Sequence, residues 1–465
     1  MKALGIDIGT TTISAVIADE SSREVIESFT IANTSFIETK MFWESLQDPA
    51  VIIGKACGLL EDIMDRHKDI CVIGLTGQMH GIVYTDRDGK HVSPLYTWQD
   101  GRGNRKCQED ESGNQRYQGD GRSACEIIEE AGGMKIHTGY GMATHFYNHM
   151  AGQVPEQAAS LCTIADYLGM VLTGRKKPLV HAGNAASLGL YDVKENRFRE
   201  DILDRLGLDV RILPEVTEKF QIPGTYQGIP VCVAVGDNQS SFLGSVRNAR
   251  ESILVNMGTG GQVSVYSSQY FTAEDIEARP FINSSYLLVG SSLCGGRAYA
   301  LLAQFFGQCA RAMGAEGKDP YEMMERFLAE NDKDDKEKKN SKKGDLLVDT
   351  RFSGTREHPE WRGGIHNIGT DNFTPQALTA GFLNGMAEEL YQMYRRMGNA
   401  AVEGKKRMIA SGNGLRKNRY LRDIMSRRFS MPLSLAAQKE EAAYGAALSG
   451  LIGTERLTVY EAVGI

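Results

Sequence analysis

A strand–turn–strand pattern occurs twice in this chain, about 250 residues apart, and it constrains the fold more than any other feature. The first copy, residues 3–19, reads ALGIDIGTTTISAVIAD, and the second, residues 253–267, reads ILVNMGTGGQVSVYS. In each copy an apolar run stops at a Gly-Thr turn and resumes with alternating apolar residues, which is typical of a β-hairpin. The repeat predicts two lobes of similar construction, with the boundary near residues 244–252.

Each of these turns can bind an anion. Consecutive backbone N–H groups in a Gly-containing turn form a concave nest, and glycine allows the positive φ that such nests need. Two nests in one chain predict binding of the phosphates of a nucleotide, although each alone is also compatible with a plain hairpin. The P-loop pattern G-x-x-x-x-G-K-[ST] and the fingerprint G-x-G-x-x-G are both absent from the sequence. A nucleotide would therefore be held by another construction.

The remaining pattern is that of an α/β protein. Short runs rich in Val and Ile alternate with longer segments that have helical spacing of apolar residues. We expect buried strands over 70–75 and 229–235, helices over 160–172 and 375–397, a helix carrying Leu421, Ile424 and Met425, and a small-residue helix over 440–450 packed against the loop 410–414.

Composition excludes several classes of function. The chain has 465 residues and a net charge of −7. It therefore lacks the excess of positive charge with which proteins usually bind nucleic acid. No apolar run reaches the roughly 18 residues of a membrane span, and the N-terminus MKALGIDIG lacks the features of a signal peptide, so we expect a cytoplasmic protein without a membrane partner. Eight cysteines occur without a C-x-x-C pair, which favours small buried side chains over a zinc or redox site.

One segment, residues 331–345, reads NDKDDKEKKNSKKGD and has almost no apolar residue. Because this segment cannot bury an apolar face against a core, we expect it to be an insertion that forms a solvated surface loop or a frayed helix end.

Two aspartates stand where chemistry is expected. Asp7 ends the first strand just before its turn, where a carboxylate can hold Mg²⁺ through water while the turn amides meet phosphate. Asp237 follows the apolar run 231–235 and begins a polar cluster, at the strand end where α/β folds place ligands. It is a candidate general base for phosphoryl transfer. The structural alternatives are a turn-capping Asp7 and a helix-capping Asp237.

Three short loops combine polar and flat or small side chains. Residues 77–81, GQMHG, and 98–102, WQDGR, offer the directional polar groups and apolar surface that a polyol demands. Within them His80 alone could equally be a structural histidine. Residues 410–414, ASGNG, open a helix and let a purine approach the backbone closely, although glycine-rich loops are common.

The order of these motifs resembles that of the FGGY carbohydrate kinases over nearly the whole chain: GIDIGTTT, GQMHG, TWQDGR, VGDNQ, NMGTGG, ASGNG and EEAAYGAALSG. The resemblance implies an α/β fold of two actin-like, ribonuclease H-like ATPase domains, 1–247 and 248–465, with the active site in the cleft between them. It implies ATP and Mg²⁺ as cofactors, a small-molecule sugar as substrate, and is compatible with a homodimer.

The resemblance also implies roles for individual residues. Asp237 would be the catalytic base and Asp7 the metal ligand. The sugar would be lined by Gln78, Met79, His80, Trp98, Asp100, Arg102 and Asn238. ATP would contact Thr10, Thr11, Thr12, Gly258, Thr259, Gly260, Gly261, Gly412, Asn413, Gly414 and Asn418.

Two motifs limit the choice of the acceptor sugar. GQMHG resembles both the xylulose- and the sedoheptulose-phosphorylating members of the family, whereas TWQDGR and ASGNGLRKN are more similar to the sedoheptulose group. Sedoheptulose is therefore the first expectation, and xylulose or another pentulose or polyol the second. An ATPase without a sugar acceptor, or a non-catalytic sugar or nucleotide sensor, is a further alternative. The acceptor loops argue against the first of these, and the presence of both Asp7 and Asp237 against the second.

Overall fold

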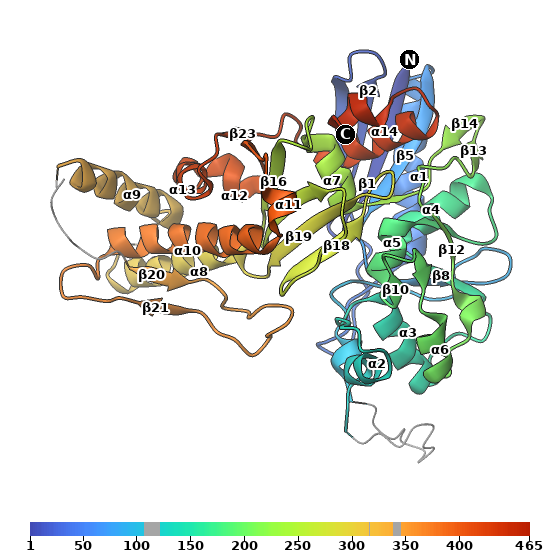
Figure 1. The fold of residues 1–465 in the computed structure, drawn as a ribbon, viewed down its shortest axis with the longest axis horizontal. Coiled ribbons are helices and arrows are strands. Elements are labelled where there is room, and N and C mark those ends of the chain that lie inside the picture. Colours follow the sequence, from blue (N-terminus) through green and yellow to red (C-terminus); the bar gives the residue numbers. More distant parts are fainter. Residues whose placement is uncertain (107–120, 316, 338–345) are drawn as a thin grey trace. The chain divides into compact units, whose positions relative to one another are not determined.

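The computed structural model describes residues 1–106, 121–315, 317–337 and 346–465, with the backbone alone for 331–337. The described chain forms two compact units (Figure 1). Unit 1 comprises Met1–Arg247, Arg279–Tyr286 and Gln438–Ile465, and unit 2 comprises Asn248–Ala278 and Leu287–Ala437. The units in space thus differ from the continuous ranges 1–247 and 248–465, because two later segments pack in unit 1.

The main sheet of unit 1 is built around the first hairpin. Its path is β13-β14-β5-β1-β2-β3, and β15 also pairs with β5. The strands are β1 (Lys2–Ile8), β2 (Thr12–Asp19), β3 (Val25–Ala32), β5 (Ile70–Gly77), β13 (Gly224–Tyr226), β14 (Ile229–Val231) and β15 (Val235–Gly236). Strand β1 is antiparallel to β2, with Ile8 opposite Ile13, and parallel to β5. The first predicted hairpin is confirmed.

The sheet of unit 2 repeats this arrangement. Its order is β18-β19-β17-β16-β22-β23. The strands are β16 (Ser252–Met257), β17 (Gly261–Ser267), β18 (Ile276–Pro280), β19 (Tyr286–Ser292), β22 (Arg407–Ser411) and β23 (Leu433–Leu435). Strand β16 is antiparallel to β17 and parallel to β22, as β1 is to β2 and β5. The second hairpin and the repeat of construction are therefore both confirmed.

The smaller elements of unit 1 surround its sheet. Its other strands are β4 (Leu46–Gln47), β6 (Val83–Thr85), β7 (Leu95–Tyr96), β8 (Ser160–Cys162), β9 (Leu179–His181), β10 (Tyr191–Asp192), β11 (Arg197–Phe198) and β12 (Glu215–Thr217). Its helices are α1 (Pro49–Arg66), α2 (Ala124–Gly132), α3 (Gly141–Met150), α4 (Ile164–Thr173), α5 (Ala182–Leu188), α6 (Glu200–Arg205), α7 (Asp237–Ser245), α14 (Glu441–Gly453) and α15 (Val459–Val463).

Two predicted elements of unit 1 differ in the structure. The helix expected over 160–172 was wrong at its start, because residues 160–162 form β8, which pairs with β6. Helix α4 begins only after Thr163, whose side chain accepts a hydrogen bond from the backbone N–H of Asp166 and so caps it. The strand expected over 229–235 is interrupted at residues 232–234, so that β14 and β15 contact β5 separately.

Helix α14 carries the last part of the chain onto unit 1. It packs on β1, β5 and α7 (Figure 1), whereas the loop 410–414 belongs to unit 2, so packing of this helix on that loop stays a prediction. Glycines permit this contact: a Cβ on Gly5 would lie 1.9 Å from the carbonyl oxygen of Ala443, and one on Gly74 would lie 1.7 Å from that of Ala446. The small residues of α14 therefore match a glycine face of the sheet, which explains why 438–465 belongs to unit 1.

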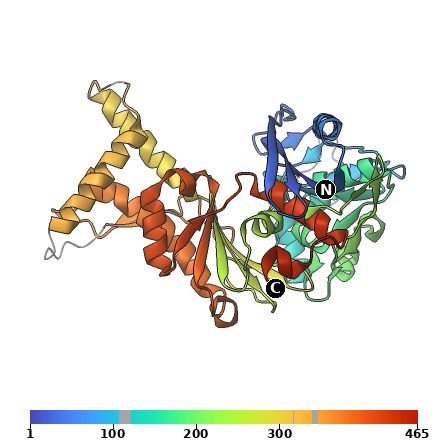
Figure 2. The same cartoon turned by 90° about the horizontal axis from the view of Figure 1, so that it is seen from above.

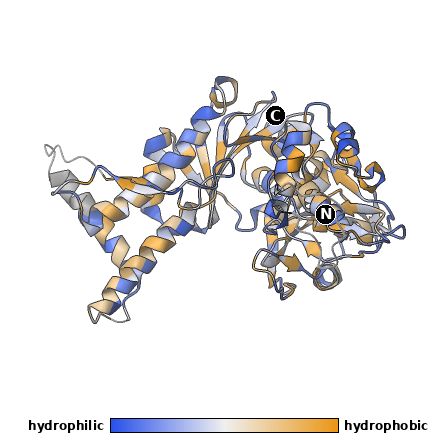
Figure 3. Cartoon of the chain, turned by 90° about the horizontal axis from the view of Figure 1, so that it is seen from below, coloured by the Kyte–Doolittle hydropathy of each residue, from blue (hydrophilic) through white to orange (hydrophobic). Residues whose placement is uncertain are grey.

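The helices of unit 2 are α8 (Gly295–Ala312), α9 (Pro320–Glu337), α10 (Pro375–Arg396), α11 (Asn399–Val402), α12 (Gly412–Lys417) and α13 (Arg419–Phe429). Helices α8, α9 and α10 pack on one another (Figure 2), and their faces alternate between apolar and polar (Figure 3). Helix α10 begins at Pro375 as predicted, capped by the side chain of Thr374. A short ladder of β20 (Leu347–Asp349) and β21 (Gly364–His366) lies in the same unit.

Two further expectations concern the surface and the cysteines. Residues 331–337 form the last turns of α9, and the rest of the charged segment lies outside the described residues. All seven described cysteines are free, and five of them are buried, as expected of small apolar side chains; Cys107 lies outside the described residues. Among the helices that the structure describes, none is long and apolar enough to span a bilayer.

Candidate active site

Three parallel strand ends gather predicted site residues at one edge of the unit 1 sheet. Asp7, near the end of β1, lies opposite Thr76 of β5. Gly236, at the end of β15, lies opposite Gly77 at the end of β5. Asp237 and the loop 78–80 follow directly. Since the carboxyl ends of parallel strands share an edge, this is where an α/β sheet binds ligands.

The carboxylate of Asp7 is held in an unusual environment. One of its oxygens, Oδ1, is buried and accepts no hydrogen bond from any described residue. Burial, with smaller contributions from the negative charges of Asp237 and Glu440, raises the pKa of Asp7 to about 7. Burial also raises the pKa of Asp237, against the opposing effect of the Arg279 guanidinium. The charges of Asp237 and Glu440 therefore both act on the Asp7 carboxylate.

These carboxylates fit a divalent cation. A buried carboxylate oxygen that lacks a donor is costly unless a ligand satisfies it, and further carboxylates nearby deepen the negative potential. Mg²⁺ prefers one or two carboxylates together with water and phosphate oxygens. Asp7 is the residue that would hold such an ion. Glu440, which sequence reasoning did not place in the site, is brought here by the segment leading into α14.

The turn after β1 is braced by side chains from several elements. The hydroxyl of Thr10 donates to Oε1 of Gln78 at 3.3 Å and accepts from Nε1 of Trp98 at 3.1 Å. Nε2 of Gln47 donates to the Thr10 carbonyl at 2.8 Å, and Nε2 of Gln78 donates to Oε1 of Gln47 at 2.9 Å. Gln47 was not predicted, because nothing in its local pattern marks it.

These hydrogen bonds give the Thr10 side chain a structural role besides the contact with ATP that the motif implies. Its hydroxyl hydrogen is directed to Gln78, so the side chain joins the turn to the predicted sugar loops. The neighbours Thr11 and Thr12 are exposed. Trp98 is 45% exposed, although it is a large aromatic residue, and an exposed aromatic face suits the C–H face of a sugar.

The loop after β5 has a constrained backbone. His80 has a φ of 72°, in the left-handed region that non-glycine residues rarely adopt. Its ring stacks on Tyr140 with centroids 4.4 Å apart, and its Nδ1 lies 2.9 Å from the carbonyl oxygen of Ser187. Met79 is buried beside the segment that leads into Asp237: a Cβ on Gly236 would lie 2.6 Å from its sulfur.

Asp100 and Arg102 bond mainly to one another. Nε of Arg102 donates to Oδ1 of Asp100 at 2.6 Å, and Nη2 donates to Oδ2 at 3.2 Å. Nη1 donates to Asn148 at 2.6 Å, and the guanidinium lies 4.2 Å from the centroid of the Tyr96 ring. Both side chains are buried. In this arrangement they shape the loop that carries Trp98. Asn238, the last residue expected at the sugar, is buried in the first turn of α7.

Unit 2 brings its predicted nucleotide residues together. The turn 258–261 packs against the start of α8: the N–H of Gly296 donates to the Gly258 carbonyl at 3.0 Å, and that of Arg297 to the Thr259 carbonyl at 2.9 Å. A Cβ on Gly296 would lie 2.2 Å from the oxygen of Gly258. The pair Gly295–Gly296 was missed, although two glycines before an apolar helical run are a readable signal.

The second loop of unit 2 lies against the first. A Cβ on Gly412 would lie 2.5 Å from the Met257 oxygen, and Gly412 itself has a φ of 81°. Nδ2 of Asn256 donates to the Ser411 hydroxyl at 2.8 Å. Asn418 caps α13 by accepting from the N–H of Leu421, while Asn413 is exposed. The loop 412–414 thus lies against Met257, which directly precedes the turn 258–261.

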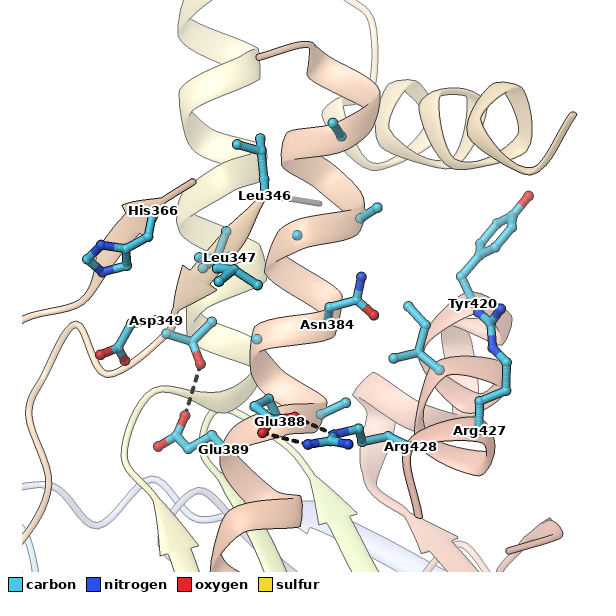
Figure 4. Close-up of a pocket in the computed structure, with 18 of the residues that line it drawn as sticks. Leu346, Leu347, Asp349, His366, Asn384, Glu388, Glu389, Tyr420, Arg427 and Arg428 are labelled. Atoms are coloured by element: carbon cyan, nitrogen blue, oxygen red, sulfur yellow. Dashed lines mark hydrogen bonds and ion pairs between the residues drawn. The ribbon is translucent and has the colours of Figure 1, made fainter. Parts of the chain in front are cut away.

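A groove of about 2020 Å³ in unit 2 is a separate feature (Figure 4). It is lined mainly by α10, α13 and β20, and holds the ion pair Glu388–Arg428 and the hydrogen bond from Thr350 to Glu389. None of the predicted nucleotide residues lines it. Its volume also exceeds the roughly 300–1,000 Å³ of a usual ligand pocket, so the turn 258–261 and the loop 412–414 stay the candidate nucleotide residues of unit 2.

Comparisons with known proteins show that this chain is similar to sugar kinases. The chain is 24% identical over 494 aligned residues to a sedoheptulokinase of Mus musculus, with 96% of each protein covered. It is 28% identical over 280 residues to a xylulose kinase of Lactococcus lactis, covering 57% of this chain and 53% of that protein. The solved structure of a xylulose kinase from Lactobacillus acidophilus superposes with a TM-score of 0.80 at 17% identity, with 99% of this chain and 91% of that one covered.

The family itself is identified by two profiles that account for almost the whole sequence. Residues 2–244 match the N-terminal domain, and residues 253–454 the C-terminal domain, of the FGGY family of carbohydrate kinases. The two-domain fold, the α/β sheets and the kinase class inferred from the motifs are confirmed. This chain belongs to the FGGY family of carbohydrate kinases and is a sugar kinase.

Proposed function

We propose that this kinase transfers the γ-phosphoryl group of ATP to a terminal hydroxyl of a ketose, with sedoheptulose as the first candidate and sedoheptulose 7-phosphate as the product. The observation that carries the proposal is the pair of carboxylates Asp7 and Asp237 at one edge of the unit 1 sheet, both with a raised pKa. Phosphoryl transfer needs a base for the acceptor hydroxyl and a cation for the phosphates, and this pair supplies one residue for each task.

Asp237 is the base in this proposal. A carboxylate whose pKa is raised by burial binds a proton more tightly than an exposed one, which favours removal of the proton from the attacking hydroxyl. Asp7 holds Mg²⁺, and the amides of Thr10–Thr12 meet the phosphates. In unit 2 the turn 258–261 binds phosphate, and the loop 412–414 with Asn418 binds adenosine.

The acceptor is bound by Gln78, Met79, His80, Trp98 and Asn238, with Asp100 and Arg102 shaping the loop that carries Trp98. Trp98 supplies an exposed aromatic face, and Gln78 and His80 supply directional polar groups. Sedoheptulose is favoured because the sedoheptulokinases of Mus musculus and Homo sapiens align with 96% of this chain and because TWQDGR resembles that group. Xylulose is the second candidate, favoured by the 28% identity to a xylulose kinase.

A coupled assay of ADP release tests the proposal. Purified protein is given Mg²⁺, ATP and, separately, sedoheptulose, xylulose, ribulose, fructose and glycerol. We expect the largest kcat/KM for sedoheptulose. A larger value for xylulose transfers the proposal to that sugar. ADP release that is equally fast without any sugar would contradict the acceptor role of the two loops.

A further inference from the structure

We infer that Ser187, on helix α5, is a positioning residue that fixes the ring of His80 for contact with the acceptor sugar. The backbone N–H of His80 donates to the Ser187 hydroxyl at 3.2 Å, and Nδ1 of the ring lies 2.9 Å from the Ser187 carbonyl oxygen. A carbonyl oxygen can only accept, so Nδ1 carries the hydrogen. In a neutral imidazole, Nε2 is then a hydrogen-bond acceptor.

The backbone of His80 shows why this support is needed. Its φ of 72° lies in the left-handed region, which is strained for a residue other than glycine. Such a conformation persists only where the surroundings determine it. Here two hydrogen bonds to Ser187 and the stacked ring of Tyr140 hold it.

Helix α5 is itself anchored from the other side. The hydroxyl of Ser187 donates to the Asn184 carbonyl at 2.8 Å. Nδ2 of Asn184 donates to Oδ1 of Asp166 at 3.1 Å and to the Ala234 carbonyl at 3.2 Å. Asp166, Asn184 and Ser187 are all buried. Ala234 stands three residues before Asp237, so one short helix supports both the acceptor loop and the strand that ends at the base.

The fixed tautomer affects which sugars bind. This consequence rests on the proposed function. Because Nε2 can only accept, a sugar hydroxyl that contacts Nε2 would donate its hydrogen to it. A sugar analogue with that hydroxyl methylated keeps its oxygen but loses its hydrogen, and so loses the bond. Loss of one hydrogen bond to a site built for it lowers kcat/KM by about tenfold or more.

The tautomer can be measured without any assay of activity. Long-range ¹H–¹⁵N spectra of the imidazole rings are recorded on the full chain at pH 8 without sugar, and His80 is assigned by the loss of its signals in His80→Asn. We expect Nδ1 to show the shift of a protonated nitrogen and Nε2 that of an unprotonated one. The opposite pattern overturns the inference, whatever the enzyme phosphorylates.

A pair of serine variants tests the role in binding. Ser187→Ala removes the hydroxyl that accepts from the backbone N–H of His80, and it keeps the backbone carbonyl that accepts from Nδ1. Ser160→Ala is the matched control, because Ser160 is similarly buried and its hydroxyl donates to the Ile212 carbonyl, away from His80. We expect Ser187→Ala to raise the KM for the preferred sugar about tenfold, with kcat and the KM for ATP nearly unchanged, and Ser187→Thr to restore it. Ser160→Ala should leave each of these constants unchanged.

An unchanged KM for the sugar in folded Ser187→Ala would overturn the positioning role. Equal rises in both KM values, or a loss shared with Ser160→Ala, would also do so, because they indicate a general loss of structure. If Ser187→Ala does not fold, the tautomer measured in the unaltered chain decides. Absence of any sugar kinase activity would contradict the proposed function, and the spectra would still decide the tautomer.

Discussion

At the scale of single residues, the carboxylates of unit 1 carry the proposed chemistry. Asp7 and Asp237 each have a pKa raised mainly by burial, and the charge of Asp237 adds to the shift at Asp7. A buried ionised carboxylate lowers the stability of the folded protein, and binding of a metal ion or a proton offsets this loss. Activity and stability should therefore respond in opposite ways to neutralising these groups.

Asp237→Asn tests the base. The amide keeps the size of the side chain but cannot accept the proton of the sugar hydroxyl, so kcat should fall by about 10²–10⁴-fold. Circular dichroism and thermal unfolding should show an intact fold. Asp65→Asn, on an exposed ion pair of α1, is the control and should keep full activity. Near-normal turnover in Asp237→Asn would remove this residue as the base.

Asp7 gives the stability of the protein a defined pH dependence. Its pKa is raised from 3.8 to about 7, so the folded state binds this proton more tightly than the unfolded state. The resulting stabilisation is complete below about pH 4 and is lost as the pH rises through 7, an effect of up to about 4 kcal/mol in the free energy of unfolding.

In Asp7→Asn that contribution is absent. The difference in unfolding free energy between the variant and the unaltered chain, measured in urea without Mg²⁺, should therefore move in favour of the variant between pH 4 and pH 7 and level off above. A difference that stays constant across this range would show that Asp7 ionises normally in the folded protein.

At the scale of elements, close approach of backbones decides how helix α14 packs. The carbonyls of α14 lie where side chains on β1 and β5 would be, and glycine is what leaves that space. The hairpins, by contrast, are determined locally, because their turns and alternation lie within a few residues of one another. The two kinds of element therefore respond differently to substitution.

Gly74→Ala tests the packing of α14. The new Cβ would lie 1.7 Å from the carbonyl oxygen of Ala446, so the strand or the helix must move, and we expect a loss of roughly 2–4 kcal/mol in the free energy of unfolding. Gly54→Ala, on α1, is the control. Apart from its chain neighbours and the backbone of its own helix, no described atom lies within 4 Å of a Cβ at Gly54, and alanine should stabilise the helix by about 0.5–1 kcal/mol. Equal effects in the two variants would contradict this packing.

At the scale of the whole molecule, the compact units are not continuous stretches of the sequence. Unit 1 is completed by Gln438–Ile465, which follows all of unit 2 in the sequence. Residues 1–247 alone would leave the glycine face of β1 and β5 uncovered and the apolar side of α14 missing. Folding of unit 1 is therefore coupled to the far end of the chain.

Two truncated chains test this coupling. Residues 1–247 expressed alone should show a broad unfolding transition and rapid proteolysis, whereas 1–247 joined by a flexible linker to 438–465 should unfold cooperatively. Differential scanning calorimetry and limited trypsin digestion provide the measurements. A cooperative transition of equal midpoint in both chains would show that α14 is dispensable for unit 1.

The sequence by itself determined the features that depend on neighbouring residues and on recurring motifs. Both hairpins, the helix starting at Pro375 and the helix carrying Leu421, Ile424 and Met425 followed from local alternation and turn chemistry, and the family and the kinase class from motif order. Asp7 and Asp237 could be selected because each ends an apolar run, which is where a strand delivers its side chain to the sheet edge.

Only the tertiary structure decided what depends on contacts between distant segments. Gln47, Ser187 and Glu440 lie beside Thr10, His80 and Asp7 because separate elements meet, and no local pattern marks them. The start of α4, the break between β14 and β15 and the placement of α14 were likewise set by neighbours across the sheet. Local interactions are fixed by adjacent residues, whereas burial and close backbone approach exist only once the chain has folded.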